Sequence, residues 1–188
     1  MKLLKEMIIE KGSVKNSKLL KVDSFLNHQI DPNLMYEIGK EFKNVFEDKK
    51  VNKVLTIEAS GIAIGIGTAY AFNVPMVFAK KNKPTTMSEN YSTVVRSFTK
   101  NKDYNITISK EFINKGDKIL IVDDFLAMGN AVIGLKKIVE EAGAEVVGVG
   151  IVIEKGFQDG GKILRKSGLH LKSLAIIDSL ENNKIHLR

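Results

Sequence analysis

Residues 119–131 read ILIVDDFLAMGNA and contain the strongest structural signal in the chain. Four aliphatic residues, Ile119–Val122, precede two adjacent acids, Asp123 and Asp124, and a short turn whose glycine, Gly129, opens a helical pattern. Such an apolar run is typical of a strand buried on both faces of a parallel sheet, whose ligands bind beyond its carboxyl end. Backbone N–H groups at the helix start attract phosphate, and the acids can accept bonds from sugar hydroxyls. A pentose 5-phosphate fits both halves of this site.

The rest of the chain alternates between strand and helix patterns. Helices are expected over Lys2–Lys11, after the N-cap pair Asp31-Pro32, and over Ile62–Phe72 and Asn130–Ala142. Strands are expected over Val54–Glu58, Pro75–Ala79, Tyr104–Ser109, Ile119–Val122, Val146–Ile153 and Leu171–Ile177. This alternation predicts an α/β fold, an open and mostly parallel twisted sheet flanked by helices, in a single domain over residues 1–188.

Composition excludes several classes of function. The chain has 188 residues, 44% of them apolar, which is enough for the core of one domain. It has no cysteine and three histidines, which excludes disulfides and thiolate chemistry and leaves little for a transition-metal site. Any metal would be a hard cation held by carboxylate or phosphate oxygens. The net charge of +7 favours a polyanionic partner, either a nucleic acid or a substrate with several phosphates.

Two segments bear on location. The acids Glu6 and Glu10 interrupt the first helix pattern, so the features of a signal peptide are missing. Residues 60–79 carry no charge, but their glycines and Pro75 divide them into a helix and a short strand and argue against a membrane span. The sequence therefore predicts a soluble, cytoplasmic protein without membrane partners.

Residues 119–131 resemble the phosphoribosyl-pyrophosphate (PRPP) motif of the type I phosphoribosyltransferases. Residues 20–32, LKVDSFLNHQIDP, and residues 151–157, IVIEKGF, are similar to base-binding segments of the bacterial xanthine branch of that family. The resemblance covers nearly the whole chain. It implies the type I phosphoribosyltransferase fold, with a small hood contributed by residues 1–30 and the C-terminal segment.

The resemblance also implies a function and a set of site residues. The reaction would convert xanthine and PRPP to xanthosine 5'-monophosphate and pyrophosphate in purine salvage, with Mg²⁺ bound alongside PRPP or pyrophosphate, in a homodimer. The catalytic residues would be Asp123 and Asp124. Xanthine would be bound by Leu20, Asn27, Lys155 and Phe125. PRPP would be bound by Ala127, Met128, Gly129, Asn130, Ala131, Ser60, Gly61, Lys80 and Lys81.

Each assignment competes with a simpler structural interpretation. Adjacent acids usually lie in a solvated loop or cap a helix, and the turn at residues 58–61 is equally typical of an ordinary strand-to-helix connection. Lys155 would otherwise be a surface residue, Asn27 a turn former and Phe125 a core aromatic. As purine ligands, Lys155 offers three donors to carbonyl oxygens, Asn27 offers a donor and an acceptor, and Phe125 offers a stacking face.

The PRPP motif departs from the family pattern at several positions. Met128 stands where the family has threonine or, in the xanthine branch, asparagine, and Asn130 and Ala131 follow where glycine or glutamine and then threonine or alanine are usual. A methionine has no hydroxyl or amide for a phosphate, so the loop would bind mainly through backbone N–H groups. Ala127 stands where the hypoxanthine-guanine branch has an aspartate, which places the chain nearer the xanthine and adenine branches.

A basic segment follows the second strand pattern. Residues 80–102 contain one acid, Glu89, and six basic residues, which are Lys80, Lys81, Lys83, Arg96, Lys100 and Lys102. Such a run usually indicates a solvated loop. The resemblance instead implies a lid that includes Ser97, Phe98 and Thr99 and excludes water from a reactive sugar cation.

Other classes of function remain open from the residues. Gly61, Gly65 and Gly67 do not have the G-x-G-x-x-G spacing, and no G-x-x-x-x-G-K-[ST] motif occurs, so dinucleotide and P-loop sites are disfavoured. A PRPP-binding transcription regulator on the same fold is one alternative, although such chains typically carry an added DNA-binding module, and nucleic acid is not the expected partner. A transferase for guanine, hypoxanthine, adenine or a pyrimidine is the other.

Overall fold

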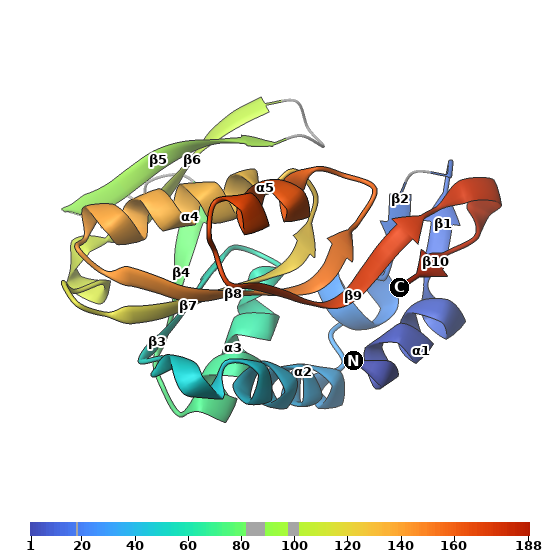
Figure 1. Ribbon diagram of the computed structural model, residues 1–188, viewed down its shortest axis with the longest axis horizontal. Helices are drawn as coiled ribbons and strands as arrows, with labels where there is room; N and C mark the ends of the chain where they lie inside the picture. The colour runs from blue at the N-terminus through green and yellow to red at the C-terminus, as the bar shows by residue number, and fades with distance from the viewer. Residues whose placement is uncertain (18, 82–88, 98–101) are drawn as a thin grey trace.

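The computed structural model describes residues 1–17, 19–81, 89–97 and 102–188. Within these residues the central sheet has eight strands. They are β3 (Lys53–Ile57), β4 (Met76–Lys81), β5 (Asn90–Ser97), β6 (Lys102–Ser109), β7 (Lys118–Leu126), β8 (Glu145–Lys155), β9 (Leu171–Ser179) and β10 (His186–Leu187). Their order across the sheet is β10-β9-β8-β7-β3-β4-β6-β5 (Figure 1).

The centre of the sheet is parallel and its edges are antiparallel. Strands β4, β3, β7, β8 and β9 pair in parallel, whereas β6, β5 and β10 run antiparallel to their neighbours. The chain steps from β3 to β4 in one direction and from β7 through β8 to β9 in the other. The order therefore reverses between β3 and β7, and open α/β sheets bind their ligands at the carboxyl ends of the strands at such a point.

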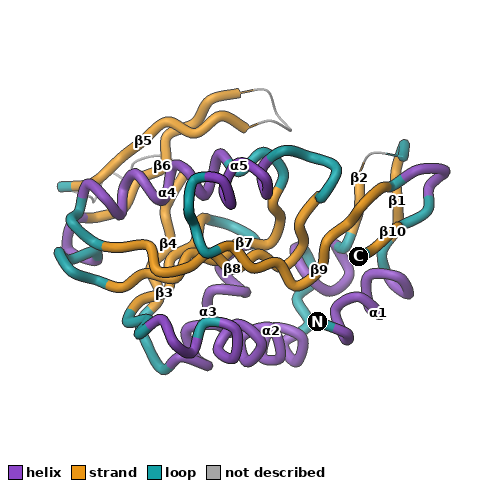
Figure 2. Tube along the Cα trace, in the orientation of Figure 1, coloured by secondary structure: helices purple, strands orange, loops and turns teal. Residues whose placement is uncertain are grey.

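Helices cover both faces of the sheet (Figures 1 and 2). Helices α2 (Pro32–Val45) and α3 (Gly61–Phe72) lie on one face, and α4 (Asn130–Glu141) and α5 (Gly160–Lys166) on the other. Each face has its own apolar core, built on α2 around Phe42 and Phe46 and on α4 around Leu135 and Ile138. The β5–β6 hairpin, at one edge of the sheet, folds over α4, so that α4 lies between the hairpin and the rest of the sheet (Figure 1).

The two ends of the chain lie together beside β9. This layer contains α1 (Lys2–Lys11), the hairpin of β1 (Ser13–Lys15) and β2 (Leu19–Lys21), the π-helix η1 (Asp23–Asn27) and β10 (Figure 1). The Met1 ammonium donates to the Leu174 carbonyl of β9 at 2.8 Å. Ser17 donates its backbone N–H and its hydroxyl to Asn183 Oδ1, both at 3.1 Å. These bonds tie the N-terminal hairpin to the C-terminal segment.

Several sequence predictions are confirmed. Helix α1 has the expected bounds, and Asp31 caps α2 by accepting bonds from the backbone N–H groups of Asn33 and Leu34 at 3.0 and 3.1 Å. The mostly parallel sheet is also confirmed. Within the described part of the chain, every helix is too short or too polar to cross a bilayer.

Two strands extend beyond what the sequence predicts. The strand at residue 119 continues through the acids to Leu126, because β8 keeps hydrogen-bonding to it as far as Glu154. Residues 90–97 form strand β5, and not a loop, because Tyr91, Thr93 and Val95 alternate with residues that point outward. Of the predicted lid, Lys83, Phe98, Thr99 and Lys100 lie outside the described residues.

Candidate active site

The acid pair lies on β7, beyond the point where β7 stops pairing with β3. Strand β7 pairs with β3 up to Ile121 and with β8 up to Leu126, so Asp123 and Asp124 lie past the paired end of β3. Asp123 Oδ1 accepts the Asp124 N–H at 3.0 Å, and Asp124 Oδ1 accepts the Phe125 N–H at 2.9 Å. Asp123 is only 7% exposed. The acids are therefore held rigidly at the end of a strand, and not in a solvated loop.

The electrostatics of Asp123 are unusual. Burial raises the pKa of its carboxyl well above the ordinary value, and the negative charge of Asp124 raises it further. The Lys81 ammonium opposes this shift. Burial also raises the pKa of Tyr104, with a smaller contribution from Asp123, and Lys81 Nζ lies 5.6 Å from the centre of the Tyr104 ring. A buried carboxyl of this kind gains from hydrogen-bond donors, which sugar hydroxyls provide.

The predicted phosphate loop connects β7 to α4. Gly129 has φ +84°, a left-handed angle that a side chain disfavours, and α4 begins at the next residue. The first N–H groups of a helix have no partner within it, so they are available to an anion. Asn130 Nδ2 donates to the Arg96 carbonyl of β5 at 3.0 Å, which ties the hairpin to the start of α4. Met128 and Ala131 are half-buried.

The turn after β3 meets the acid pair. A Cβ added to Gly61 would overlap Thr56 Oγ1 and would lie 3.4 Å from Asp123 Oδ1. The turn therefore approaches Asp123 as closely as only a glycine permits. Ser60 is half-buried at the start of α3. The Lys81 backbone N–H donates to Glu58 Oε1, which fixes the end of β4 to the same turn.

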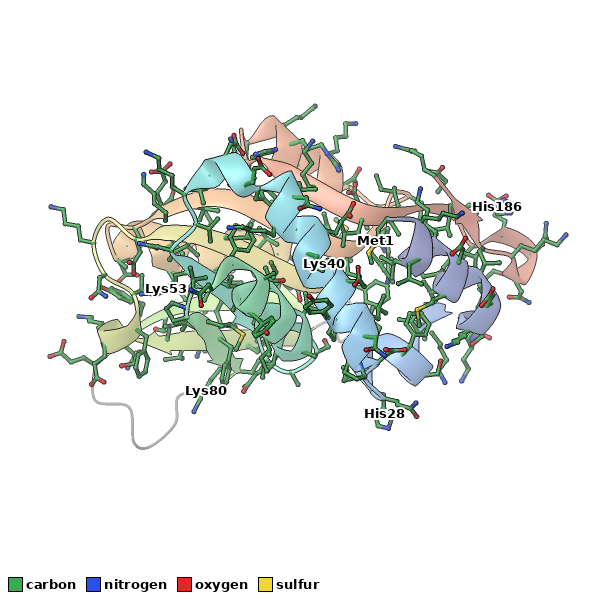
Figure 3. The ribbon with its side chains drawn as sticks, turned by 90° about the horizontal axis from the view of Figure 1, so that it is seen from below. Met1, His28, Lys40, Lys53, Lys80 and His186 are labelled. Carbon is green, nitrogen blue, oxygen red and sulfur yellow. The ribbon has the colours of Figure 1, made fainter. Side chains whose placement is uncertain are left out.

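The two lysines assigned to PRPP point to different sides. Successive side chains of a strand face opposite ways. Lys81 influences the pKa of Asp123, whereas Lys80 extends away from the body of the protein (Figure 3). The structure thus brings Lys81, and not Lys80, toward the acid pair.

Two of the predicted base-binding residues, Phe125 and Lys155, lie on neighbouring strands of the central sheet, and Leu20 and Asn27 lie in the N-terminal layer. Lys155 is 9% exposed, and its Nζ lies 5.6 Å from the centre of the Phe125 ring. Burial lowers the pKa of Lys155, and the charge of Asp124 opposes that shift, which places its ammonium near the acid pair. Leu20 is buried, and Phe125 packs against the same apolar cluster. The interpretation of Lys155 as a solvated surface residue is therefore wrong.

Three buried polar atoms stand out in the described part of the chain. Asn27 Oδ1, Thr56 Oγ1 and Gln158 Oε1 are buried there without a hydrogen-bond partner. Buried polar atoms are nearly always paired in native proteins. Asn27 ends η1, Thr56 Oγ1 lies beside Gly61, and the Gln158 N–H donates to the Lys155 carbonyl at 2.9 Å. Polar atoms so placed are suited to a polar ligand.

Sequence reasoning missed Thr56 and Gln158. Thr56 lies inside a strand pattern, where a threonine is ordinary, and Gln158 follows the IVIEKGF segment in an unremarkable turn. The one available signal was a hydroxyl at Thr56 between the apolar residues Leu55 and Ile57 of the predicted strand. Their orientation depends on contacts between distant segments.

Comparison with known proteins identifies the family. The family described as "Phosphoribosyl transferase domain" matches residues 27–169. The chain belongs to the phosphoribosyltransferase family. A curated protein of Clostridium novyi named xanthine phosphoribosyltransferase is 58% identical over 98% of both chains. One with the same name from Clostridioides difficile is 53% identical over the full length of both.

Solved structures support the fold of a phosphoribosyltransferase. The structure of adenine phosphoribosyltransferase from Rhodothermus marinus superposes with a TM-score of 0.77 and covers 94% of this chain and 100% of its own. At 21% sequence identity, this likeness concerns the fold alone. The type I phosphoribosyltransferase fold expected from the sequence is thereby confirmed.

Proposed function

We propose that this chain transfers the 5-phosphoribosyl group of PRPP to xanthine, forming xanthosine 5'-monophosphate and pyrophosphate in purine salvage. The observation that carries the proposal is the meeting of the acid pair, the Gly61 turn and the buried Lys155 at the carboxyl ends of β3, β7 and β8. The curated relatives named xanthine phosphoribosyltransferase support the choice of base. We place the reaction in the cytoplasm, because polyanionic PRPP does not cross an apolar membrane unaided.

The proposed chemistry exchanges one bond at the anomeric carbon for another. The bond from C1 of the ribose to the pyrophosphate oxygen breaks, a bond from C1 to a purine nitrogen forms, and the purine releases its proton. C1 becomes oxocarbenium-like as pyrophosphate leaves. Asp123 and Asp124 accept bonds from the ribose hydroxyls and favour the developing positive charge. The start of α4 holds the 5-phosphate, and the Ser60-Gly61 turn and Lys81 hold the pyrophosphate.

In this proposal xanthine is bound by groups from four elements, β2, η1, β7 and β8. The Lys155 ammonium donates to a carbonyl oxygen and favours an anionic form of the base. Phe125 stacks on the ring, Leu20 contacts it, and Asn27 pairs with the polar edge through its amide. The layer formed by α1, β1, β2, η1 and β10 acts as the hood that carries Leu20 and Asn27.

The acid pair fits Mg²⁺ that arrives with PRPP. Among the described residues, no group of three or more His, Cys, Asp or Glu side chains could hold a metal by itself. Mg²⁺ typically keeps several waters and binds one or two carboxylates together with substrate phosphates. Bound in this way it would neutralise charge on the leaving pyrophosphate. Asp123 and Asp124 are the residues placed to approach it.

A panel of nucleobases tests the choice of substrate. With PRPP and Mg²⁺ present, we expect the initial rate of pyrophosphate release to be highest with xanthine, because a buried lysine suits a purine with two carbonyls that loses a proton readily. Guanine and hypoxanthine share one of these carbonyls and should be slower. Adenine and uracil serve as controls. Preference for adenine or a pyrimidine would contradict the assignment of Lys155.

We also propose a homodimer that uses the exposed face of α3. This helix carries no charged residue, yet Ile66 and Tyr70 are 58% and 75% exposed, and Tyr36 of α2 lies beside Tyr70 with ring centres 6.3 Å apart. A helix that is apolar on all sides is normally buried. A second copy of this chain would cover the face that one subunit leaves in water.

Light scattering tests the dimer. The unmodified chain should elute with twice the monomer mass, and Tyr70→Glu should elute as a monomer because its charge would be desolvated at the interface. Phe112→Glu is the matched control, since Phe112 is also exposed but belongs to the η3 turn (Lys110–Phe112) and not to α3. A fully active monomer at assay concentration would reject the dimer.

A further inference from the structure

Strand β8 ends in two neighbouring residues whose side chains serve different parts of the molecule. Lys155 lies over Phe125, on the face proposed to bind xanthine. Glu154 contacts α5, on the opposite face. This division follows from the alternation of side chains along a strand. Glu154 has no part in the proposed chemistry, yet it is one of the few buried charges in the described residues.

The bonds of Glu154 join α5 to two strands. Arg165, in the last turn of α5, donates from Nη1 to Glu154 Oε1 at 2.8 Å and from Nη2 to Oε2 at 2.7 Å. The Ser173 hydroxyl of β9 also donates to Oε2. Burial alone would raise the pKa of Glu154, but the bonds from Arg165 and Ser173 outweigh it and leave the pKa below its ordinary value. The carboxylate is therefore ionised and held at three points.

The other end of α5 supports the phosphate loop. The Gly160 N–H, at the first residue of α5, donates to the Ala127 carbonyl at 3.0 Å. A Cβ added to Gly160 would overlap that carbonyl oxygen and would lie 2.8 Å from Gly129 N. A Cβ added to Gly129 would lie 3.4 Å from Cγ of buried Leu164, so this side chain of α5 lies close beside the loop. Helix α5 thus begins against the backbone of the loop that leads into α4, bonded to Ala127 and with no room for a side chain on Gly160.

We infer that Glu154 is a positioning residue for PRPP: through Arg165 and α5 it fixes the 127–129 loop that receives the 5-phosphate. The inference rests on the proposed function. A helix as short as α5 does not hold its own shape or orientation in water, so its position depends on what anchors it. A two-bond guanidinium–carboxylate pair fixes orientation as well as distance, which apolar contact alone does not. Glu154 and Lys155, neighbours on β8, would then determine the affinity for PRPP and the affinity for xanthine separately.

The test compares the affinity for each substrate in matched variants. Glu154→Gln should weaken PRPP binding about tenfold while the KM for xanthine changes less than about twofold, because a misplaced phosphate loop loses geometry that the base pocket keeps. Gly160→Ala should have the same selective effect, since its methyl group pushes directly on the loop. PRPP dissociation constants come from calorimetry with Mg²⁺ present, and folding is checked by circular dichroism.

Asp117→Asn is the matched control for a lost ion pair. Asp117 Oδ2 bonds buried Lys53 Nζ at 2.5 Å at the amino ends of β3 and β7, where Lys53 is seen in Figure 3. This variant should lose stability and leave both substrate affinities unchanged. It separates a general loss of stability from a specific effect on the phosphate loop.

The outcomes distinguish the inference from the proposed function. The positioning role is wrong if Glu154→Gln and Gly160→Ala bind PRPP as tightly as Asp117→Asn does. It is also wrong if they lower the affinities for PRPP and xanthine equally. If Glu154→Gln does not fold, Gly160→Ala decides. If the unmodified chain binds PRPP but does not turn over xanthine, the proposed function fails, while the PRPP affinities of the variants still decide the role of Glu154. No PRPP binding by the unmodified chain would overturn both.

Discussion

Asp123→Asn is expected to lower turnover by about a hundredfold or more, the usual cost of removing one polar group that stabilises a transition state. The amide keeps the shape of the carboxyl and can still accept the Asp124 N–H, so the site should stay in place. Asp124→Asn should also lower turnover, because it removes the second negative charge near the ribose. Rates with saturating PRPP and xanthine measure both effects.

The same variant is expected to keep or gain stability. The pKa of Asp123 in the folded protein is raised above its unfolded value, so folding favours the protonated form. Its contribution to stability is complete below the unfolded pKa and declines as the pH rises through the folded pKa. Asp123→Asn removes this decline, which unfolding in denaturant at several pH values would detect. Full activity of both acid variants, or unfolding of both, would contradict the assigned role.

Asp117→Asn provides the contrast at the other end of β7. Burial raises the pKa of Asp117, but the bonds from Lys53 and the Asn114 N–H outweigh it, so its folded pKa lies below its ordinary value. Its contribution is present above the unfolded pKa and is lost as the pH falls through the folded pKa. This substitution should lower the free energy of unfolding by about 1–3 kcal/mol without affecting turnover. The same change, from Asp to Asn, thus has opposite expected effects just before β7 and near its carboxyl end.

Lys155→Ala is expected to raise the KM for xanthine roughly tenfold or more, while the KM for PRPP changes little. A buried carbonyl that loses its donor costs about 1–3 kcal/mol, which corresponds to that factor. Asn27→Ala should act in the same direction, because Asn27 Oδ1 is buried without a partner. The two Michaelis constants are measured by varying one substrate at saturating levels of the other.

Lys172→Ala is the control for loss of a lysine from the same sheet. Lys172 lies on β9 and is exposed, so neither constant should change. If Lys155→Ala raised the KM for PRPP and left the KM for xanthine unchanged, Lys155 would belong to the pyrophosphate site. The base pocket would then need a different set of residues.

Local sequence signals were sufficient for the elements that frame the site. The run Ile119–Val122 and the pair Asp31-Pro32 act over a few residues, and both formed the predicted strand and helix start. Gly129 likewise has the left-handed angle expected of a turn glycine. Periodicity and capping are properties of short segments, so they can be read without knowledge of the fold.

Features that depend on distant segments were not predicted. The extension of β7 through Asp123 depends on pairing with β8, and the short β1, β2 and β10 strands depend on contact between the two chain ends. Burial of Glu154 depends on Arg165 and Ser173, which lie on other elements. The many charged residues of the segment 80–102 are typical of a loop, although the alternation of apolar and polar side chains within it indicates strand β5. Tertiary context overrides local preference most strongly in such strands.

The most direct test of the proposed function follows both products of one reaction. The purified chain is incubated with PRPP, Mg²⁺ and xanthine, and pyrophosphate and the new nucleotide are quantified together. We expect xanthosine 5'-monophosphate and pyrophosphate in equal amounts, and about a hundredfold less of both from Asp123→Asn over the same time. Absence of the nucleotide, together with sequence-specific DNA retention at physiological salt, would contradict it and indicate a PRPP-binding regulator.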